Sequence, residues 1–336
     1  MQKEALYYEK LENKKVQCHL CPWECLLTEG KLGICRAKKN LQGVLYAINY
    51  AKAVSIALDP IEKKPLYHFF PGTDILSTGP NSCNLRCNHC QNWSISQIES
   101  PTELVTPADL VSLALKYNSP GIAYTYTEPL MWYEYVLDTA KLARHKKLVN
   151  VLVTNGYINP EPLEKLLPLI DALNIDVKGM SREFYKKVCK GKLDVVLKTV
   201  KISVERNKHV ELTYLLIPTL NDSEDELRKF VDWAADLSDC IPVHFSRYFP
   251  TYKSELPPTP VWTLKKAFRI AKEKLKYVYV GNAYIPGTSD TYCPKCSKVL
   301  ISRSGYSIDI AGIKDEKCKN CGTEVDVTLK AEGNRQ

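Results

Sequence analysis

Thirteen cysteines in 336 residues constrain this chain more than any other feature, because nearly all of them are grouped. Cys189 and Cys240 stand alone, and we expect both to be ordinary buried thiols. The three groups are Cys18, Cys21, Cys25 and Cys35; Cys83, Cys87 and Cys90; and Cys293, Cys296, Cys318 and Cys321. Clustered thiols in a reducing compartment bind metals or do redox work more often than they form disulfides, and a group of three cannot pair internally. The sequence therefore favours metal sites over a disulfide framework.

The overall composition is that of a soluble globular protein, with 45% hydrophobic and 25% charged residues. No apolar run approaches the roughly 18–20 residues that cross a bilayer, and the first residues are charged where a signal peptide would be apolar. We therefore expect a cytoplasmic protein without a membrane partner. The net charge of +8 is spread without long basic runs, so a nucleic-acid partner is not indicated.

Short β-branched or aromatic runs alternate with longer amphipathic stretches from about residue 75 onward. Candidate strands occupy residues 75–79, 121–127, 149–155, 172–178, 210–218, 242–249 and 277–282. Their near-continuous apolar character is typical of parallel strands buried on both faces. Helix-start signals lie between them, with Thr106 before Pro107 and Asn159 before Pro160. The pattern predicts an α/β fold, and six or seven βα units favour a complete or partial barrel over a short open sheet.

The cysteine groups and this alternation suggest three domains. Residues 1–74 form an N-terminal extension with four cysteines spaced C-x2-C-x3-C-x9-C, which suffice for zinc or for a second iron–sulfur cluster. Residues 75–285 form the core barrel. Residues 286–336 form a zinc-ribbon-like module, because two C-x2-C pairs flank a hairpin-like stretch, a spacing typical of a tetrahedral zinc site.

The central group, Cys83-x3-Cys87-x2-Cys90, follows the first strand of the α/β region, where a barrel presents its active face. Three thiolates cannot fill a tetrahedral zinc site by themselves, but they can hold three irons of a [4Fe–4S] cluster. The fourth iron then stays open for chemistry. The alternative is a zinc site completed by His89 or by a distant residue.

The segment CNLRCNHC resembles the signature of radical S-adenosylmethionine (SAM) enzymes, and within them the pyruvate formate-lyase-activating-enzyme-like branch. From about residue 15 to about residue 325, the chain resembles the AmmeMemoRadiSam-system radical SAM enzymes. The matching segments include CHLCPWECLLTEGKLGICRAKKN, DPIEKKPLYHFFPG, YTYTEPLMWYEY, TNGYI, NIDVKG, HFSRYFPTYK and YVYVGN.

This resemblance implies a partial (β/α)6 barrel of the TIM type and a [4Fe–4S] cluster on Cys83, Cys87 and Cys90. An electron from a donor such as ferredoxin or flavodoxin would drive SAM cleavage to a 5′-deoxyadenosyl radical. That radical would abstract hydrogen from an unidentified substrate, which could be a protein. One alternative is activation of a glycyl-radical enzyme of the pyruvate formate-lyase type. An alternative of another class is a non-catalytic electron-transfer protein or nucleic-acid adaptor.

The resemblance also assigns SAM contacts. His89 occupies the position that packs near adenine, and Glu128 the last position of a Gly-Gly-Glu motif that meets the methionine ammonium. The two glycines are Tyr126 and Thr127 here. The remaining contacts implied are Thr154, Asn155, Asp176 and Lys178. Relatives often carry an acid where this chain has Val153.

Strand position independently supports several of these residues. Glu128, Asn155 and Asp176 each end an apolar run, so a polar side chain there should point into a barrel mouth. Loop capping would place polar residues at the same positions. His244 and Arg247 lie on a late strand and could touch substrate, although a core histidine fits that position equally well.

Overall fold

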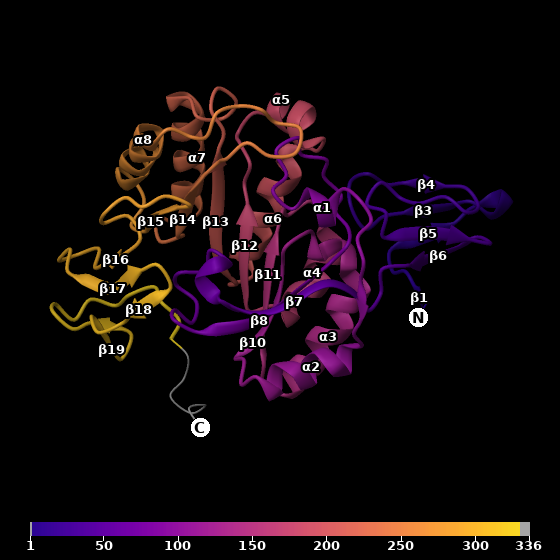
Figure 1. Ribbon diagram of the computed structural model, residues 1–336, viewed down its shortest axis with the longest axis horizontal. Helices are drawn as coiled ribbons and strands as arrows, with labels where there is room; N and C mark the ends of the chain where they lie inside the picture. Colours follow the sequence, from indigo (N-terminus) through magenta and orange to yellow (C-terminus); the bar gives the residue numbers. More distant parts are fainter. Residues whose placement is uncertain (1, 330–336) are drawn as a thin grey trace.

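A nine-stranded sheet forms the centre of the computed structural model, which describes residues 2–329 (Figure 1). Its parallel strands follow one another in chain order, and each matches a strand expected from the sequence. These strands are β8 (Asp74–Pro80), β10 (Gly121–Tyr124), β11 (Val149–Thr154), β12 (Ala172–Asp176), β13 (His209–Leu216), β14 (Val243–Arg247) and β15 (Val278–Gly281). Sequential parallel pairing places all their carboxyl ends along one edge of the sheet.

Two antiparallel strands extend the sheet beyond β8. β7 (Lys52–Pro60) pairs with β8 on one side and with the short β9 (Glu103–Leu104) on the other. Within the described residues the sheet runs from β15 to β9 without closing on itself. The architecture is therefore the partial barrel that the sequence predicted.

Helices connect the parallel strands and cover the outside of the sheet (Figure 1). Their bounds are α1 (Trp93–Ser96), α2 (Pro107–Lys116), α3 (Tyr133–His145), α4 (Pro160–Leu166), α5 (Arg182–Phe184), α6 (Leu193–Glu205), α7 (Glu224–Leu237) and α8 (Val261–Lys272). Single 3-10 or π turns are η1 (Glu12–Lys14), η2 (Ile61–Lys63), η3 (Pro129–Trp132), η4 (Leu167–Leu169) and η5 (Tyr185–Cys189). α2 and α4 begin at the two expected prolines, and the Thr106 side chain caps α2 by accepting a hydrogen bond from Asp109 N–H. None of the helices in residues 2–329 has the length and apolar character needed to cross a membrane.

β10 is shorter than the expected strand 121–127, because the chain leaves the sheet after Tyr124. Tyr126 has φ +65°, a left-handed conformation that is costly for a bulky side chain. Thr125 N–H still donates to Thr78 C=O of β8, at 2.8 Å. The early turn brings Glu128 towards the carboxyl end of β11.

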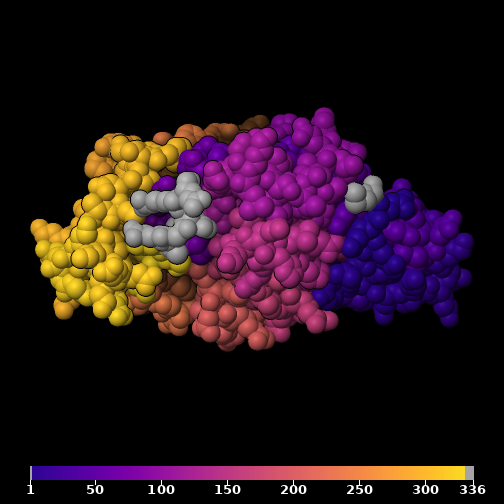
Figure 2. Space-filling model, turned by 90° about the horizontal axis from the view of Figure 1, so that it is seen from below, coloured from indigo at the N-terminus to yellow at the C-terminus, as the bar shows by residue number. Residues whose placement is uncertain are grey.

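Two smaller cysteine-containing parts flank the sheet at opposite ends of the molecule (Figure 2). The N-terminal part has the antiparallel sheets β2-β3-β4 and β1-β6-β5, and the C-terminal part has β16-β17-β18 and β19-β20. Their bounds are β1 (Lys3–Glu4), β2 (Tyr8–Lys10), β3 (Val16–Cys18), β4 (Leu26–Leu27), β5 (Lys38–Leu41), β6 (Val44–Ala47), β16 (Thr291–Tyr292), β17 (Val299–Ser304), β18 (Ser307–Asp309), β19 (Ile313–Lys314) and β20 (Lys317–Cys318). A small core that includes Leu300, Ile301 and Ile313 packs with the C-terminal cysteines.

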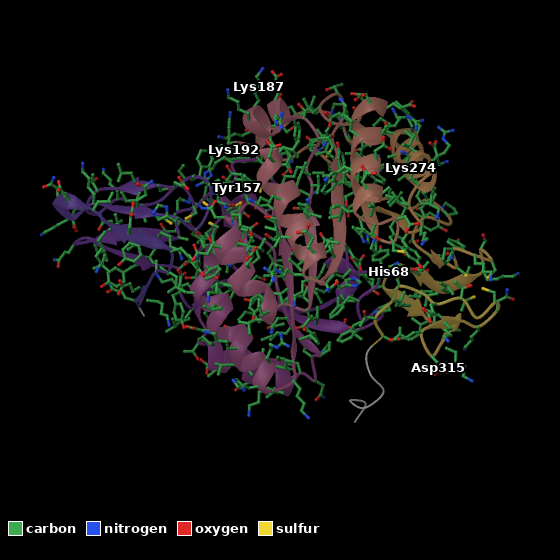
Figure 3. All side chains as sticks on the ribbon, turned by 180° about the vertical axis from the view of Figure 1, so that it is seen from behind. His68, Tyr157, Lys187, Lys192, Lys274 and Asp315 are labelled. Carbon is green, nitrogen blue, oxygen red and sulfur yellow. The ribbon has the colours of Figure 1, made fainter. Side chains whose placement is uncertain are left out.

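His68 links the barrel to the C-terminal part, at the position labelled in Figure 3. Its Nδ1 lies 2.6 Å from the Asp326 carbonyl oxygen and its Nε2 lies 2.6 Å from the Tyr279 hydroxyl. Arg303 of β17 donates to the Tyr67 carbonyl oxygen at 2.7 Å. Hydrogen bonds on both sides therefore fix the segment around residues 67–68 between the central sheet and the C-terminal part.

The close packing of β10 on β11 gives a test of the fold. A Cβ at Gly121 would lie 2.1 Å from the Val149 carbonyl oxygen, so Gly121→Ala forces the two strands apart. We expect the free energy of unfolding to fall by about 3 kcal/mol, measured by chemical denaturation. Gly281→Ala is the matched control, because the atom it would meet is the Ser246 hydroxyl oxygen at 3.3 Å. Equal stability of the two variants would contradict this packing.

Candidate functional site

A cavity of about 630 Å³ opens at the carboxyl ends of the parallel strands. The structure brings every site residue expected in the barrel to its wall, namely Cys83, Cys87, His89, Cys90, Glu128, Thr154, Asn155, Asp176 and Lys178. His244 also reaches the cavity, but Arg247 is not among its lining residues and instead donates to the Thr259 carbonyl oxygen at 2.9 Å. Sequential parallel pairing explains this convergence, since successive strands place their ends side by side.

The loop between β8 and α1 carries the three central cysteines. Arg86 anchors it from inside, because its guanidinium donates to the Cys83 carbonyl oxygen at 2.7 Å and its N–H donates to the Cys189 carbonyl oxygen at 2.9 Å. Ser96 Oγ lies 3.2 Å from the Cys90 sulfur. A tight loop held at several points can present three sulfur atoms to one cofactor without further folding.

The electrostatic surroundings favour neutral thiols when no metal is bound. Burial raises the pKa of Cys83 and of Cys90 above the ordinary thiol value. For Cys87 the largest cause of its raised pKa is a hydrogen bond with Cys189, followed by burial. Metal ligation requires thiolates, so binding here would release protons.

Cys189 was missed by the sequence reasoning as a neighbour of the site. It is fully buried, as expected, but it ends the π turn η5 and contacts the Cys87 thiol. The sequence separation of the two cysteines gave no signal of this contact. Cys240, also expected to be buried, is partly exposed because it lies on the Asp239 turn beside Lys276.

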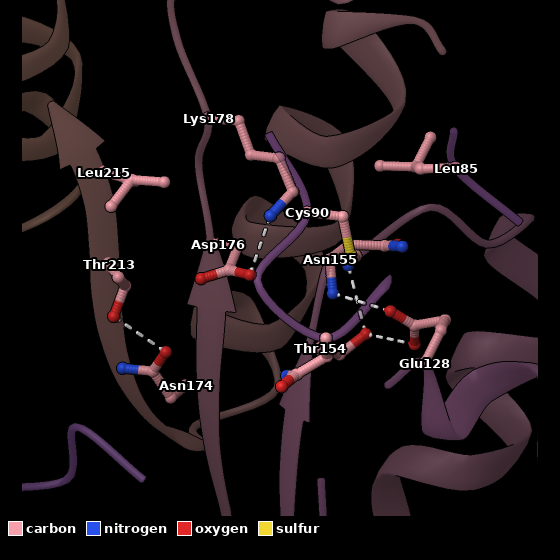
Figure 4. A network of polar contacts seen from close by, with 12 residues as sticks. Leu85, Cys90, Glu128, Thr154, Asn155, Asn174, Asp176, Lys178, Thr213 and Leu215 are labelled. Carbon is pink, nitrogen blue, oxygen red and sulfur yellow. Dashed lines mark hydrogen bonds and ion pairs between the residues drawn. The ribbon is translucent and has the colours of Figure 1, made fainter. Parts of the chain in front are cut away.

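Figure 4 shows the hydrogen bonds that join Glu128 to Thr154 and Asn155. Glu128 is 1% exposed, and its carboxylate accepts hydrogen bonds from Thr154 Oγ1 at 2.6 Å, Asn155 N–H at 2.8 Å and Leu130 N–H at 3.0 Å. Burial raises the pKa of Glu128 to about 7, against these hydrogen bonds, which lower it. A carboxylate offers about four acceptor positions, so roughly one remains for a cationic ligand.

Asp176 and Lys178 form an ion pair at the end of β12, with 2.8 Å between Oδ2 and Nζ (Figure 4). His89 lies on the cysteine loop and has a buried Nδ1 without a hydrogen-bond partner. Burial, together with the Lys178 charge, lowers the pKa of His89 to about 3, so this imidazole is neutral. A neutral ring with an unpartnered nitrogen at the cavity wall is suited to packing against, and hydrogen bonding with, a heterocyclic ligand.

His244 is tied to a buried carboxylate as well as facing the cavity. Its Nε2 lies 2.6 Å from Glu211 Oε2, and Glu211 also accepts hydrogen bonds from the N–H groups of Tyr67 and His68. These hydrogen bonds supply donors to both carboxylate oxygens of Glu211 in the interior of the barrel. The alternative of a hydrogen-bonded core histidine therefore fits His244 well.

A second polar group at the cavity was not expected from the sequence. Asp59, at the end of β7, accepts hydrogen bonds from Lys64 Nζ and from Tyr126 Oη, each at 2.7 Å. Burial alone would raise the pKa of Asp59, but these two hydrogen bonds, the charge of Lys64 and a hydrogen bond from Lys63 outweigh it and lower the pKa to about 2. Tyr126 replaces a glycine of the family motif, and its φ of +65° is a conformation that glycine adopts without strain.

The two terminal cysteine groups lie away from this cavity. Among the described residues, the C-terminal group brings its four sulfur atoms within 4.8 Å of one another, with 3.6 Å from Cys293 to Cys321 and 3.7 Å from Cys296 to Cys318. A tetrahedron with metal–sulfur bonds of about 2.3 Å has edges of about 3.8 Å, so this group can hold one metal ion. Cys18, Cys21, Cys25 and Cys35 together line a separate, small cavity.

The raised pKa of Glu128 predicts pH-dependent stability. Because the folded value of about 7 exceeds the ordinary 4.5, Glu128 contributes stability that is present below pH 4.5 and lost as the pH rises through 7. The contribution is about 3 kcal/mol. We expect Glu128→Gln to vary less in its free energy of unfolding between about pH 5 and pH 8, measured by urea titration.

The exposed Glu164 provides the control for this measurement, since Glu164→Gln leaves the buried carboxyl in place. That variant should follow the wild-type pH curve. A Glu128→Gln curve that also coincides with wild type would mean that the carboxyl is already ionised across this range, contrary to its buried surroundings.

Comparisons with known proteins identify a family with this arrangement. Residues 79–231 match the model of the radical SAM superfamily. A relative from Methanocaldococcus jannaschii, named Uncharacterized protein MJ0808, is 47% identical over 337 residues, covering 97% of this chain and 100% of the relative. The pyruvate formate-lyase-activating enzyme of Clostridium pasteurianum is 28% identical over 160 residues, covering 45% of this chain and 65% of that enzyme.

Solved structures share the fold at low sequence identity. Streptococcus suis SuiB bound to S-adenosylmethionine superposes with a TM-score of 0.50 at 13% identity, covering 60% of this chain and 48% of SuiB. A radical SAM methyltransferase from Sphaerobacter thermophilus gives a TM-score of 0.50 at 13% identity, covering 67% of this chain and 70% of that one. At this identity the likeness concerns the fold alone.

Proposed function

The chain belongs to the radical SAM superfamily, and from that premise we propose that Cys83, Cys87 and Cys90 hold a [4Fe–4S] cluster at which SAM is cleaved. The single observation that carries this assignment is the convergence of three thiols and the Glu128 network on one cavity of about 630 Å³. A cluster held by these cysteines would pass one electron from a donor protein to SAM, which would split into methionine and a 5′-deoxyadenosyl radical able to take a hydrogen atom from the substrate.

The residues present fit these two groups. Three cysteines leave one iron of a four-iron cluster without a protein ligand. Asn155 Nδ2 lies 3.6 Å from the Cys83 sulfur, and the backbone N–H of the same residue donates to the Glu128 carboxylate, so Asn155 joins the cysteine loop to Glu128. The buried and unpartnered Nδ1 of His89 supports an adenine position beside it.

Each polar side chain has a distinct task in this proposal. Glu128 binds the methionine ammonium with its remaining acceptor position, and a bound cation would favour its ionised form. Thr154 and Asn155 orient Glu128 through the hydrogen bonds at 2.6 and 2.8 Å. Lys178 neutralises Asp176 while presenting positive charge towards the SAM carboxylate. Glu128, Thr154 and Asn155 are buried, so fixed protein hydrogen bonds rather than water would surround the bound methionine ammonium.

A protein substrate is the proposed partner, with ferredoxin or flavodoxin as the electron donor. Support comes from the relatives named pyruvate formate-lyase-activating enzyme, which match 45% of this chain in Clostridium pasteurianum and 47% in Escherichia coli. The same relatives support activation of a glycyl-radical enzyme as the second candidate. The segments quoted above support an AmmeMemoRadiSam-type enzyme, whose substrate would be a different one.

SAM cleavage is tested with anaerobically reconstituted protein. The reduced wild type should convert SAM to 5′-deoxyadenosine, measured by liquid chromatography, and Cys87→Ala should fall to the rate of a reaction without protein. Cys240→Ser is the matched control, since Cys240 lies on the surface beside Lys276. Absence of 5′-deoxyadenosine from the wild type, or its undiminished release by Cys87→Ala, would refute the proposed function.

For the C-terminal group we propose zinc, held by Cys293, Cys296, Cys318 and Cys321. Cys318→Ser should lower the zinc content by one ion per chain, measured by mass spectrometry of the metals. It should also lower the melting temperature, because metal binding stabilises only the folded state. Zinc content equal to that of Cys240→Ser would contradict this assignment.

A further inference from the structure

The N-terminal cysteines form a site that the proposed reaction does not use. Cys18 ends β3, Cys21 and Cys25 lie in the following turn, and Cys35 precedes β5. All four are free and line one cavity of about 10 Å³, together with Trp23 and Lys38. A methyl group at Gly33 would lie 3.7 Å from the Cys35 sulfur and 3.8 Å from the Cys25 sulfur, so these two sulfurs crowd over the same glycine.

The backbone supplies a hydrogen-bond donor to one of these sulfurs. Ala37 N–H donates to the Cys35 sulfur at 3.5 Å. A backbone donor of this kind stabilises the negative charge that a sulfur carries once it ligates a metal.

A buried positive charge lies beside the same cavity. Lys38 is 1% exposed, and its Nζ pairs with the Glu134 carboxylate, which is also 1% exposed. Four thiolates with one metal ion or cluster carry net negative charge, which a nearby cation stabilises. The donor type, the shared cavity and the nearby charge therefore suit a thiolate-bound metal centre.

Asn84 connects this site to the central cysteine loop. Its Nδ2 donates to the Tyr157 carbonyl oxygen at 2.6 Å, and the Tyr157 ring packs against Trp23, which lies between Cys21 and Cys25, with 6.3 Å between the ring centroids. Asn84 Oδ1 accepts from Asn155 Nδ2 at 3.1 Å, and that same Nδ2 lies 3.6 Å from the Cys83 sulfur. Figure 3 labels Tyr157, which lies where the N-terminal part meets the barrel.

Further contacts hold the two cysteine loops together. Trp23 Nε1 donates to the Asn84 carbonyl oxygen at 2.8 Å. Arg86, between Cys83 and Cys87, donates to the Ile34 carbonyl oxygen. Arg36 donates in return to the Ser96 carbonyl oxygen at 3.0 Å. We therefore expect a displacement of one loop to displace the other, because these hydrogen bonds connect them.

We propose that Cys18, Cys21, Cys25 and Cys35 hold a second metal centre, a zinc ion or an iron–sulfur cluster, and that Asn84 couples its occupancy to the central cysteine loop. Asn84 acts here as a positioning residue. The metal centre stands on its own contacts, whereas the coupling rests on the proposed function, because it requires a cluster on Cys83, Cys87 and Cys90.

Metal and sulfide analysis of the full chain, prepared without oxygen, tests the metal centre. The double variant Cys18→Ser/Cys25→Ser should lose one zinc, or the iron and sulfide of one cluster, and keep the metals of the other two groups. The element lost distinguishes zinc from cluster. Cys240→Ser should keep the full content, and Cys87→Ala should lose only the central iron.

If the double variant does not fold, Cys25→Ser serves as the test variant. Cys25 is the least buried of the four thiols, so we expect this single substitution to disturb folding least. Unchanged metal content in Cys25→Ser and in the double variant overturns the metal centre. This measurement does not depend on SAM cleavage, so it remains decisive even if the wild type forms no 5′-deoxyadenosine.

The coupling is tested by electron paramagnetic resonance of the reduced central cluster. Asn84→Ala should keep the N-terminal metal yet shift the cluster spectrum or its midpoint potential, because contacts to cluster sulfurs tune both. Cys25→Ser changes no residue of the central loop, but it should shift the same signal because the N-terminal metal centre is altered. Spectra of both variants identical to that of Cys240→Ser overturn the coupling.

Discussion

The site depends on the hydrogen bonds that the buried carboxylate of Glu128 accepts. This carboxylate joins the segment that follows β10 to the end of β11 through Thr154 and Asn155, and Asn155 Nδ2 in turn lies 3.6 Å from the Cys83 sulfur. A buried carboxylate is costly unless it is hydrogen-bonded, so its three donors are a requirement of its burial. The same donors fix the direction of its remaining acceptor position at the wall of the cavity. The hydrogen bonds that stabilise the strand ends therefore also set the shape of the cavity.

The three cysteine groups differ in geometry as well as in spacing. In the C-terminal group the sulfur atoms lie within 4.8 Å of one another, a separation that suits a single ion. The central cysteines are spread along the wall of a much larger cavity, shared with Glu128 and His89. A compact set of four ligands suits a structural ion, whereas an incomplete set beside open space suits a cofactor that must meet a second molecule.

The N-terminal part is more than an appendage to the barrel. Its cysteine-containing segment contacts the central loop where Trp23 donates to the Asn84 carbonyl oxygen, and Arg36 and Arg86 donate across the same junction in opposite directions. The C-terminal part makes a comparable contact at the other side, where Arg303 holds the backbone of Tyr67. The barrel wall is therefore braced from both ends by cysteine-containing parts.

Local pattern was enough to predict the parallel strands, the helix starts at Pro107 and Pro160, and the cavity position of Glu128, Asn155 and Asp176. These follow from the alternation of apolar runs and from the rule that strand ends meet at one edge, both of which are properties of short segments. The grouping of the cysteines is likewise a matter of spacing along the chain. The sequence alone therefore determined the α/β class, the carboxyl-end location of the site and the number of thiol groups.

Only the tertiary structure decided which distant residues meet. The contacts of Cys87 with Cys189, of Asp59 with Tyr126 and of Asn84 with Trp23 join segments whose separation carries no periodic signal. Likewise, Arg247 turns to the Thr259 carbonyl oxygen because the chain after β14 folds back over it. The physical reason is that a contact of about 3 Å between such segments depends on the packing of whole elements, and packing is set by the complete core rather than by any local run of residues.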